Sequence, residues 1–290
     1  MPHAPRGNAK IWYEALGDPA APALLFIGGF SAQYFGWPDD FCQLFVEHGF
    51  RVIRFDNRDV GLSQQFDGRD GHLPGYTVHD MAGDGFAVLD HLGLDAAHVV
   101  GQSMGGMIAQ AMASDRPDRV LSLALVYTAP WIDVGFLPPL ATVDQLELAP
   151  VSRDAFIDIM VASARFHATD AYPLDEAWAR DEAQRGYDRA YTPAGVERQL
   201  RAMLTDLGAP FADPARLAMP VVLIHGLDDR QVHVSASREL ARLLPHAEVH
   251  LYPGMGHFLP RALWQECRDI VTRSARRASA PPRPPHSPAP

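Results

Sequence analysis

The segment Gly101-Gln102-Ser103-Met104-Gly105 carries the residue types and spacing that point most directly to chemistry. It stands between an apolar run at residues 98–100, typical of a buried strand, and an apolar pattern with helical spacing at residues 107–112. A Gly-x-Ser-x-Gly segment at such a junction forms a sharp turn that brings the serine oxygen to a helix N-terminus, where negative charge is favoured. The segment predicts that Ser103 is a nucleophile. The alternative is a serine that only caps the helix.

A serine hydroxyl attacks when a base takes its proton, and that base needs an acid to orient it. In sheets that carry this turn, the acid and then the histidine follow the serine at the ends of later strands. The run at residues 249–252 leads through a glycine-rich turn to His257. The sequence contains 13 histidines, and this position predicts His257 as the base. His225, at the end of another run, is expected to pack or hydrogen-bond locally.

Two adjacent acids, Asp228 and Asp229, follow the apolar run at residues 221–224. Because the side chains of neighbouring residues diverge, one of the two can reach the imidazole. The Gly226-x-x-Asp229 spacing favours Asp229, and Asp228 is the alternative. Asp133, which follows the run at residues 121–126, is a third candidate.

A tetrahedral oxyanion needs hydrogen-bond donors close to the nucleophile. The amide of Met104, at the start of the helix, is one expected donor. The glycine-rich loop at residues 28–30 lets a second backbone amide approach the site, with Phe30 preferred and Gly29 as the alternative. An ordinary turn at Gly28-Gly29 would leave this loop without that function.

The elements that must position these residues are short apolar runs separated by helical patterns. Strands are predicted at residues 23–27, 51–55, 98–100, 121–126, 221–224 and 249–252, and helical patterns include residues 41–48 and 81–92. Near-continuous apolar strands alternating with helices predict an α/β fold with a doubly wound, mostly parallel sheet. Residues 10–13 are expected in an antiparallel hairpin at the sheet edge.

The alternation stops between residues 131 and 211, where helical patterns at residues 154–166, 175–187 and 193–207 replace strands. We expect a helical cap, or lid, inserted into a core made of residues 1–130 and 212–273. An elaborate loop packed on the core is the alternative. The proline-rich tail, residues 274–290, is expected to be disordered.

Composition limits the classes of partner. The chain of 290 residues has a formal net charge of −10, so neither nucleic acid nor an anionic membrane surface is expected as its partner. No run is long and apolar enough for a signal peptide or a membrane span, and we expect a soluble cytoplasmic protein. The two cysteines, Cys42 and Cys267, are expected to be buried thiols, although a disulfide between them is an alternative.

These residues also carry a resemblance to a known family. From about Lys10 to Arg273 the chain resembles the α/β-hydrolase superfamily, and more narrowly aclacinomycin methylesterase and related bacterial esterases. The resemblance lies in residues 36–41, residues 52–63, the Ser103 turn and residues 253–257. It implies an α/β-hydrolase fold with the same nucleophile, base and orienting acid.

The resemblance also implies that residues 56–63 are structural, with Arg58 and Asp59 paired. The chain departs from the pattern at Gly28-Gly29, where the superfamily often has His-Gly, at Gln102, and throughout the cap.

The combined interpretation is a serine carboxylic-ester hydrolase that cleaves a small or medium ester through an acyl-enzyme. Its partner is a small-molecule ester, and the chemistry needs no metal and no organic cofactor. Cap residues could line an apolar pocket or form the core of the cap, and those considered are Trp131, Phe136, Phe166, Trp178 and Tyr187.

Other activities use the same three residues, namely those of a proline iminopeptidase-like aminopeptidase, a perhydrolase or a carbon–carbon hydrolase. An aminopeptidase needs a cap carboxylate for the substrate ammonium, for which Glu147, Glu176, Glu182 and Glu197 are candidates. Epoxide and haloalkane hydrolysis are disfavoured because those reactions use Asp at the position of Ser103. A non-catalytic binding protein is the alternative from another class. The sequence does not fix the natural substrate or the oligomeric state.

Overall fold

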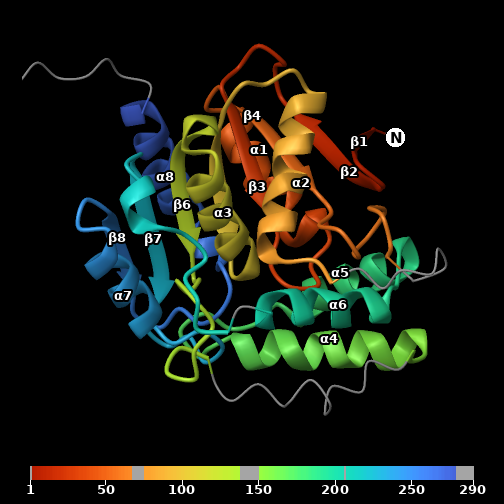
Figure 1. Cartoon of the computed structure of the whole chain (residues 1–290). Coiled ribbons are helices and arrows are strands. Elements are labelled where there is room, and N and C mark those ends of the chain that lie inside the picture. The colour runs from red at the N-terminus through yellow and green to blue at the C-terminus, as the bar shows by residue number, and fades with distance from the viewer. Residues whose placement is uncertain (1, 67–74, 138–149, 206, 279–290) are drawn as a thin grey trace, which may run out of the picture.

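The computed structural model describes residues 2–66, 75–137, 150–205 and 207–278. Its centre is an eight-stranded sheet with the strand order β1-β2-β4-β3-β5-β6-β7-β8 (Figure 1). The strands are β1 (His3–Arg6), β2 (Ala9–Leu16), β3 (Ala23–Ile27), β4 (Arg51–Phe55), β5 (Ala97–Gln102), β6 (Val120–Val126), β7 (Val221–Gly226) and β8 (Glu248–Tyr252). The α-helices are α1 (Asp39–Val46), α2 (Val78–His91), α3 (Met104–Asp115), α4 (Arg153–His167), α5 (Glu176–Arg189), α6 (Pro193–Leu204), α7 (Ser235–Leu243) and α8 (Trp264–Ala278).

The sheet is parallel from β4 to β8 and antiparallel at its other edge. β1 pairs antiparallel with β2, and β2 pairs antiparallel with β4. The edge hairpin predicted around residues 10–13 is therefore confirmed. Each strand predicted from an apolar run is present, which confirms the doubly wound, mostly parallel sheet.

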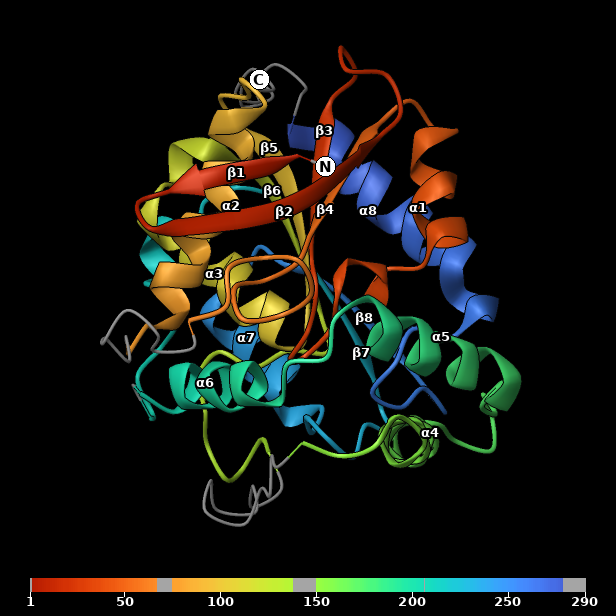
Figure 2. The ribbon, with the colours of Figure 1, turned by 90° about the vertical axis from the view of Figure 1, so that its right-hand side faces the viewer.

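Both faces of the sheet are covered by helices, which explains the near-continuous apolar strands. Successive strand residues point to opposite faces, so Leu25 joins the core beneath α2, α3 and α7, while Phe26 joins the core beneath α1 and α8. Figure 2 shows these two helical layers on either side of the sheet. The two cysteines lie in the second core as free, buried thiols, so no disulfide joins them.

Between β6 and β7 the described residues form three α-helices, α4, α5 and α6, and a short 3-10 helix at Pro214–Arg216. The three α-helices match the helical patterns in the sequence closely, although α6 ends at Leu204 rather than at Leu207. The three helices lie together across one end of the sheet (Figure 1). We refer to residues 131–211 as the helical insertion.

Buried ion pairs attach the helical insertion to the loop that follows β4. Arg198 of α6 donates to both carboxylate oxygens of Asp59, and Arg189 of α5 pairs with Asp56 at 2.7 Å. Arg58 instead pairs with Asp84 of α2 at 2.6 Å. The expected pairing of Arg58 with Asp59 is wrong, because their side chains leave the loop toward different helices.

The last helix extends farther than expected. α8 ends at Ala278, so residues 274–278 are helical rather than part of a disordered tail. The reason is burial: Ser274 is 2% exposed and Ala275 is 1% exposed, and both continue the buried face formed by Ile270 and Val271. The rest of the expected tail, residues 279–290, lies outside the described residues.

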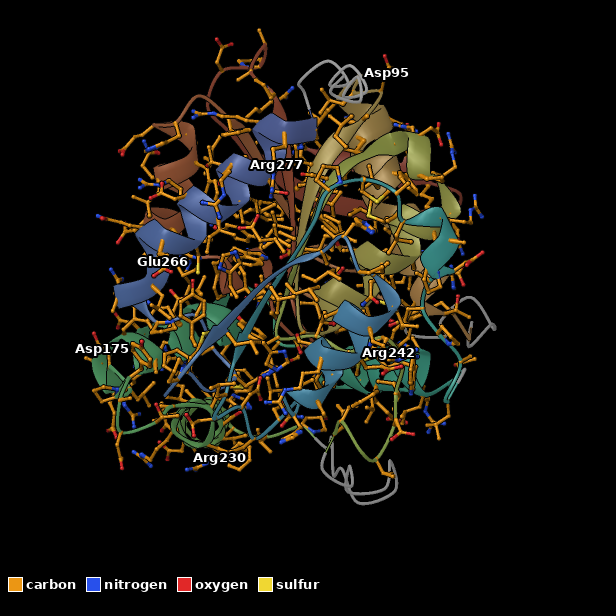
Figure 3. All side chains as sticks on the ribbon, turned by 90° about the vertical axis from the view of Figure 1, so that its left-hand side faces the viewer. Asp95, Asp175, Arg230, Arg242, Glu266 and Arg277 are labelled. Atoms are coloured by element: carbon orange, nitrogen blue, oxygen red, sulfur yellow. The ribbon has the colours of Figure 1, made fainter. Side chains whose placement is uncertain are left out.

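Charged side chains cover the outer faces of the helices. Arg242 on α7, and Glu266 and Arg277 on α8, are examples in Figure 3. Within the described ranges, no helix combines the length and the apolar character that crossing a bilayer requires.

Candidate active site

Ser103 stands on a strained turn between β5 and α3. Its backbone has φ 52° and ψ −123°, a left-handed conformation that is uncommon for a residue with a side chain. A Cβ atom on Gly101 would collide with the carbonyl of Gly105, and one on Gly105 would collide with the carbonyl of Ile27. The two glycines are thus required by close backbone contacts, and the turn brings the serine to the N-terminus of α3 as the sequence predicts.

The structure brings the three predicted side chains together. The hydroxyl of Ser103 is 3.0 Å from Nε2 of His257 and is placed to donate to it. On the other side of the ring, Nδ1 of His257 donates to Oδ2 of Asp229 across 2.7 Å. The carboxylate therefore fixes the ring so that Nε2 faces the serine oxygen and can accept its proton.

Asp229 is held in a buried, hydrogen-bonded position. It is 4% exposed, and its Oδ1 accepts the backbone amides of Gln231 and Val232, each across 2.8 Å. Burial raises the pKa of Asp229, but the neighbouring imidazoles of His257 and His225 outweigh it and hold that pKa well below its ordinary value. The carboxylate is thus ionised at neutral pH and can stabilise a positive charge on His257.

The alternative acids lie elsewhere. Asp228 is exposed, and its Oδ2 accepts the amide of Gly254 across 2.7 Å, which holds the start of the loop that carries His257. Asp133 is exposed and accepts the amide of Gly135. His225 is engaged locally, as expected, because its ring bonds to Ser237 Oγ and to the carbonyl of Val232.

The loop expected to supply an oxyanion donor lies against the nucleophile. A Cβ atom on Gly29 would be 3.4 Å from the Cβ atom of Ser103. Met104 is the first residue of α3, so its amide has no acceptor four residues earlier in the helix. Within the described residues, no hydrogen bond uses the amide of Phe30. Met104 and Phe30 therefore remain the candidate donors.

Two residues beside the serine form a hydrogen-bonded pair that the sequence did not reveal. The hydroxyl of Tyr127 donates to Gln102 Oε1 across 2.7 Å, and Gln102 Nε2 donates to the carbonyl of Gly36. Burial raises the pKa of Tyr127, which keeps the hydroxyl protonated as a donor. The Tyr127 ring also contacts the ring of His257, with the ring centroids 4.7 Å apart. The available sequence signal for Tyr127 was its position, because it directly follows the strand β6.

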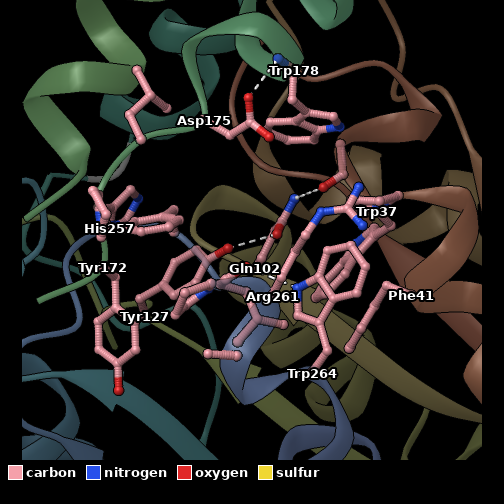
Figure 4. A pocket seen from close by; sticks show the side chains of 18 of the residues that line it. Trp37, Phe41, Gln102, Tyr127, Tyr172, Asp175, Trp178, His257, Arg261 and Trp264 are labelled. Carbon is pink, nitrogen blue, oxygen red and sulfur yellow. Dashed lines mark hydrogen bonds between the residues drawn. The ribbon is translucent and has the colours of Figure 1, made fainter.

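A cavity of about 480 Å³ lies beside His257 and Gln102 (Figure 4). Most of its wall is apolar, with aromatic rings from both the core and the helical insertion. The aromatic residues of the wall include Trp37, Phe41 and Trp264 from the core and Tyr172 and Trp178 from the insertion.

Among the insertion aromatics singled out in the sequence, Trp178 lines this cavity. The others make contacts of their own: Trp131 packs with Phe136, Phe166 with His167, and Tyr187 with Tyr191.

Comparisons with known proteins bear on the family and the fold of this chain. The family model described as alpha/beta hydrolase fold matches residues 22–260. The chain is 31% identical to rhodomycin D methylesterase from Streptomyces peucetius, over 94% of this chain and 97% of that protein. It is 25% identical to a bifunctional esterase/perhydrolase from Acinetobacter calcoaceticus, over 88% of this chain and 92% of that protein.

Among solved structures, a meta-cleavage product hydrolase from Pseudomonas fluorescens has a similar fold. Its TM-score is 0.76 at 19% identity, with 96% of this chain and 98% of that chain covered. The fold and the resemblance predicted from the sequence are confirmed: the chain belongs to the α/β-hydrolase family.

Proposed function

We propose that this chain is a serine carboxylic-ester hydrolase in which Ser103 is the nucleophile, His257 the base and Asp229 the orienting acid. The observation that supports it best is the continuous pair of hydrogen bonds, 3.0 Å from Ser103 to His257 and 2.7 Å from His257 to Asp229. That arrangement is the one in which a weakly nucleophilic hydroxyl becomes reactive at neutral pH.

In the proposed mechanism, Oγ of Ser103 forms a bond to the ester carbonyl carbon while Nε2 of His257 takes the hydroxyl proton. The amides of Met104 and Phe30 hold the resulting oxyanion. Collapse breaks the carbon–oxygen bond of the ester, and His257 returns its proton to the leaving alcohol. Water then attacks the acyl-enzyme by the same route, which releases the acid and restores the serine hydroxyl.

We propose that the helical insertion is a cap over this site. Its helices lie across the end of the sheet, and residues of the insertion and of the core share the wall of the cavity beside His257. The aromatic, apolar wall supports an ester with an apolar group. Because the relative at 31% identity is named a methylesterase, methyl esters belong in the first substrate set, together with p-nitrophenyl esters.

An aminopeptidase is less well supported than an esterase. Glu176 and Glu197 are engaged in exposed pairs with arginines, at 2.6 and 2.7 Å, and Glu147 lies outside the described residues. Glu182 is not among the residues that line the cavity. The cavity wall includes Asp175, whose Oδ1 accepts the amide of Trp178 as a helix cap; this is the one carboxylate among the described residues of the wall, and most of that wall is apolar.

The test is hydrolysis of p-nitrophenyl acetate and butyrate by the wild-type protein and by Ser103→Ala. We expect turnover by the wild-type protein and a loss of about 10⁴-fold or more in Ser103→Ala, because the substitution removes the attacking oxygen. Ser235→Ala, at a half-buried serine of α7 outside the site, is the matched control and should retain wild-type activity. Undiminished activity in Ser103→Ala would reassign the nucleophile.

A further inference from the structure

The segment between α4 and α5 is packed onto the loop that carries His257. The hydroxyl of Thr169 donates to the carbonyl of Gly254. A Cβ atom on Gly256 would collide with the carbonyl of His167, and one on Gly254 would be 3.6 Å from the ring of Tyr172. The helical insertion therefore contacts the histidine loop closely at both of its glycines.

His167, the last residue of α4, also contacts the base itself. The ring centroids of His167 and His257 are 5.4 Å apart, with the ring planes at 56°. The ring of Tyr127, at the end of β6, lies 4.7 Å from the same imidazole. Two rings from different parts of the chain thus restrict the orientation of His257, in addition to its hydrogen bond with Asp229.

His167 is connected to the acid as well as to the base. The side chain of Gln231 is among the groups that influence the charge state of the His167 ring, and the amide of Gln231 donates to Oδ1 of Asp229 across 2.8 Å. The same residue of the insertion therefore contacts His257 directly and reaches the loop of Asp229 through one intermediate residue.

Burial, reinforced by the neighbouring His257, lowers the pKa of His167 to about 4. At neutral pH the ring of His167 is consequently uncharged. An uncharged neighbour does not oppose the positive charge that His257 acquires when it takes a proton, whereas a second cation at this distance would.

We propose that His167 is a positioning residue that holds the imidazole of His257 in line between Asp229 and Ser103, so that the helical insertion completes the site. This inference rests on the proposed function, because it assigns His167 a role toward the proposed base. His167 acts through His257 and takes no proton from the substrate or the nucleophile.

The test measures how fast Ser103 reacts with a small alkyl fluorophosphonate. In that reaction Oγ of Ser103 forms a bond to phosphorus, fluoride leaves, and the serine proton passes to His257. The rate therefore reports the alignment of the serine and the base without depending on a substrate pocket. We expect His167→Ala to slow this labelling and to lower kcat on p-nitrophenyl acetate by roughly 10- to 100-fold, the scale of a small misplacement of a reacting group. KM should change much less than kcat.

Two further variants separate positioning from a general loss of structure. His167→Phe keeps a flat ring beside His257 and should recover most of the labelling rate. His167→Leu fills similar space without a flat ring, so its Ser103 should still be labelled slowly. If the alanine variant does not fold, the comparison of the phenylalanine and leucine variants still tests the inference. His246→Ala is the matched control, because His246 is exposed and lies outside the site. Urea unfolding of each variant measures what fraction of it is folded under the labelling conditions.

Labelling of folded His167→Ala and His167→Leu at the wild-type rate would overturn the inference, as would equal slowing in the phenylalanine and leucine variants. Failure of the proposed function gives a different result, since Ser103→Ala would then retain turnover whatever the His167 variants do. If turnover requires Ser103 but the His167 variants are labelled at the wild-type rate, only the positioning role of His167 is rejected.

Discussion

At the scale of single residues, two adjacent carboxylates have different surroundings and therefore different roles. Asp229 is buried and bonds to His257, whereas Asp228 is exposed and holds the amide of Gly254. Spacing in the sequence favoured Asp229, which is the carboxylate that contacts His257 in the structure. It gave no indication of the bond from Asp228, because the partner amide lies 26 residues later and meets it only in the folded protein.

The two acids provide a matched prediction. Asp229→Asn should lower kcat on p-nitrophenyl acetate by roughly 10⁴-fold, because an amide cannot accept the Nδ1 proton in the same way or stabilise the charged ring. Asp228→Asn keeps an oxygen that can accept the Gly254 amide, so its kcat should stay within about threefold of wild type. Steady-state kinetics of both variants decides the assignment, and the reverse pattern would make Asp228 the orienting acid.

Other residues at the site could not be predicted for a related reason. Tyr127 and His167 reach His257 from the end of β6 and the end of α4, and neither belongs to a local motif. The contact of His167 depends on how the helical insertion packs against the core, and the contact of Tyr127 depends on how the loop after β8 folds against the end of β6. Ser103, by contrast, stands in a motif whose strand, turn and helix are all local in sequence.

At the scale of elements, the bounds of strands and helices were predicted well where the apolar pattern is strong and poorly where it is weak. The central strands β3, β5 and β7 are short apolar runs buried on both faces, so their positions were predicted well. The end of α8 was missed because its buried face there consists of Ser274 and Ala275, which look like the start of a polar tail. Helical spacing from Ile270 and Val271 was the available signal.

The turn between β5 and α3 gives a prediction about an element. Gly105→Ala should destabilise the fold by about 1–3 kcal/mol, because its Cβ atom has to displace the backbone of Ile27. It should also reduce turnover, since the same displacement moves Ser103. Gly75→Ala is the control: Gly75 is exposed and a Cβ atom there meets nothing within 4 Å. Urea unfolding and ester kinetics measure both effects, and equal stability of the two variants would contradict the close contact.

At the scale of the whole molecule, the helical insertion is joined to the core by charges that are buried in the interface. The loop after β4 contributes Asp56 and Asp59, both fully buried, and α5 and α6 contribute Arg189 and Arg198. The family resemblance implied that this loop is structural but also implied that Asp59 pairs with Arg58. The true partner of Asp59 lies 139 residues later, a distance that no local pattern can report.

Two arginines on α6 test how much this attachment contributes. Arg198→Leu leaves Asp59 buried without the cation that faces it, so we expect a loss of about 3–5 kcal/mol in the free energy of unfolding. Arg201→Leu removes an exposed pair with Glu197 on the same helix and should cost less than about 0.5 kcal/mol. Urea unfolding measures both values.

Because the insertion also contacts the loop of His257, Arg198→Leu should lower ester turnover at urea concentrations where the core remains folded. A loss of stability as small as that of Arg201→Leu would mean that apolar packing, and not the buried pair, holds the insertion in place.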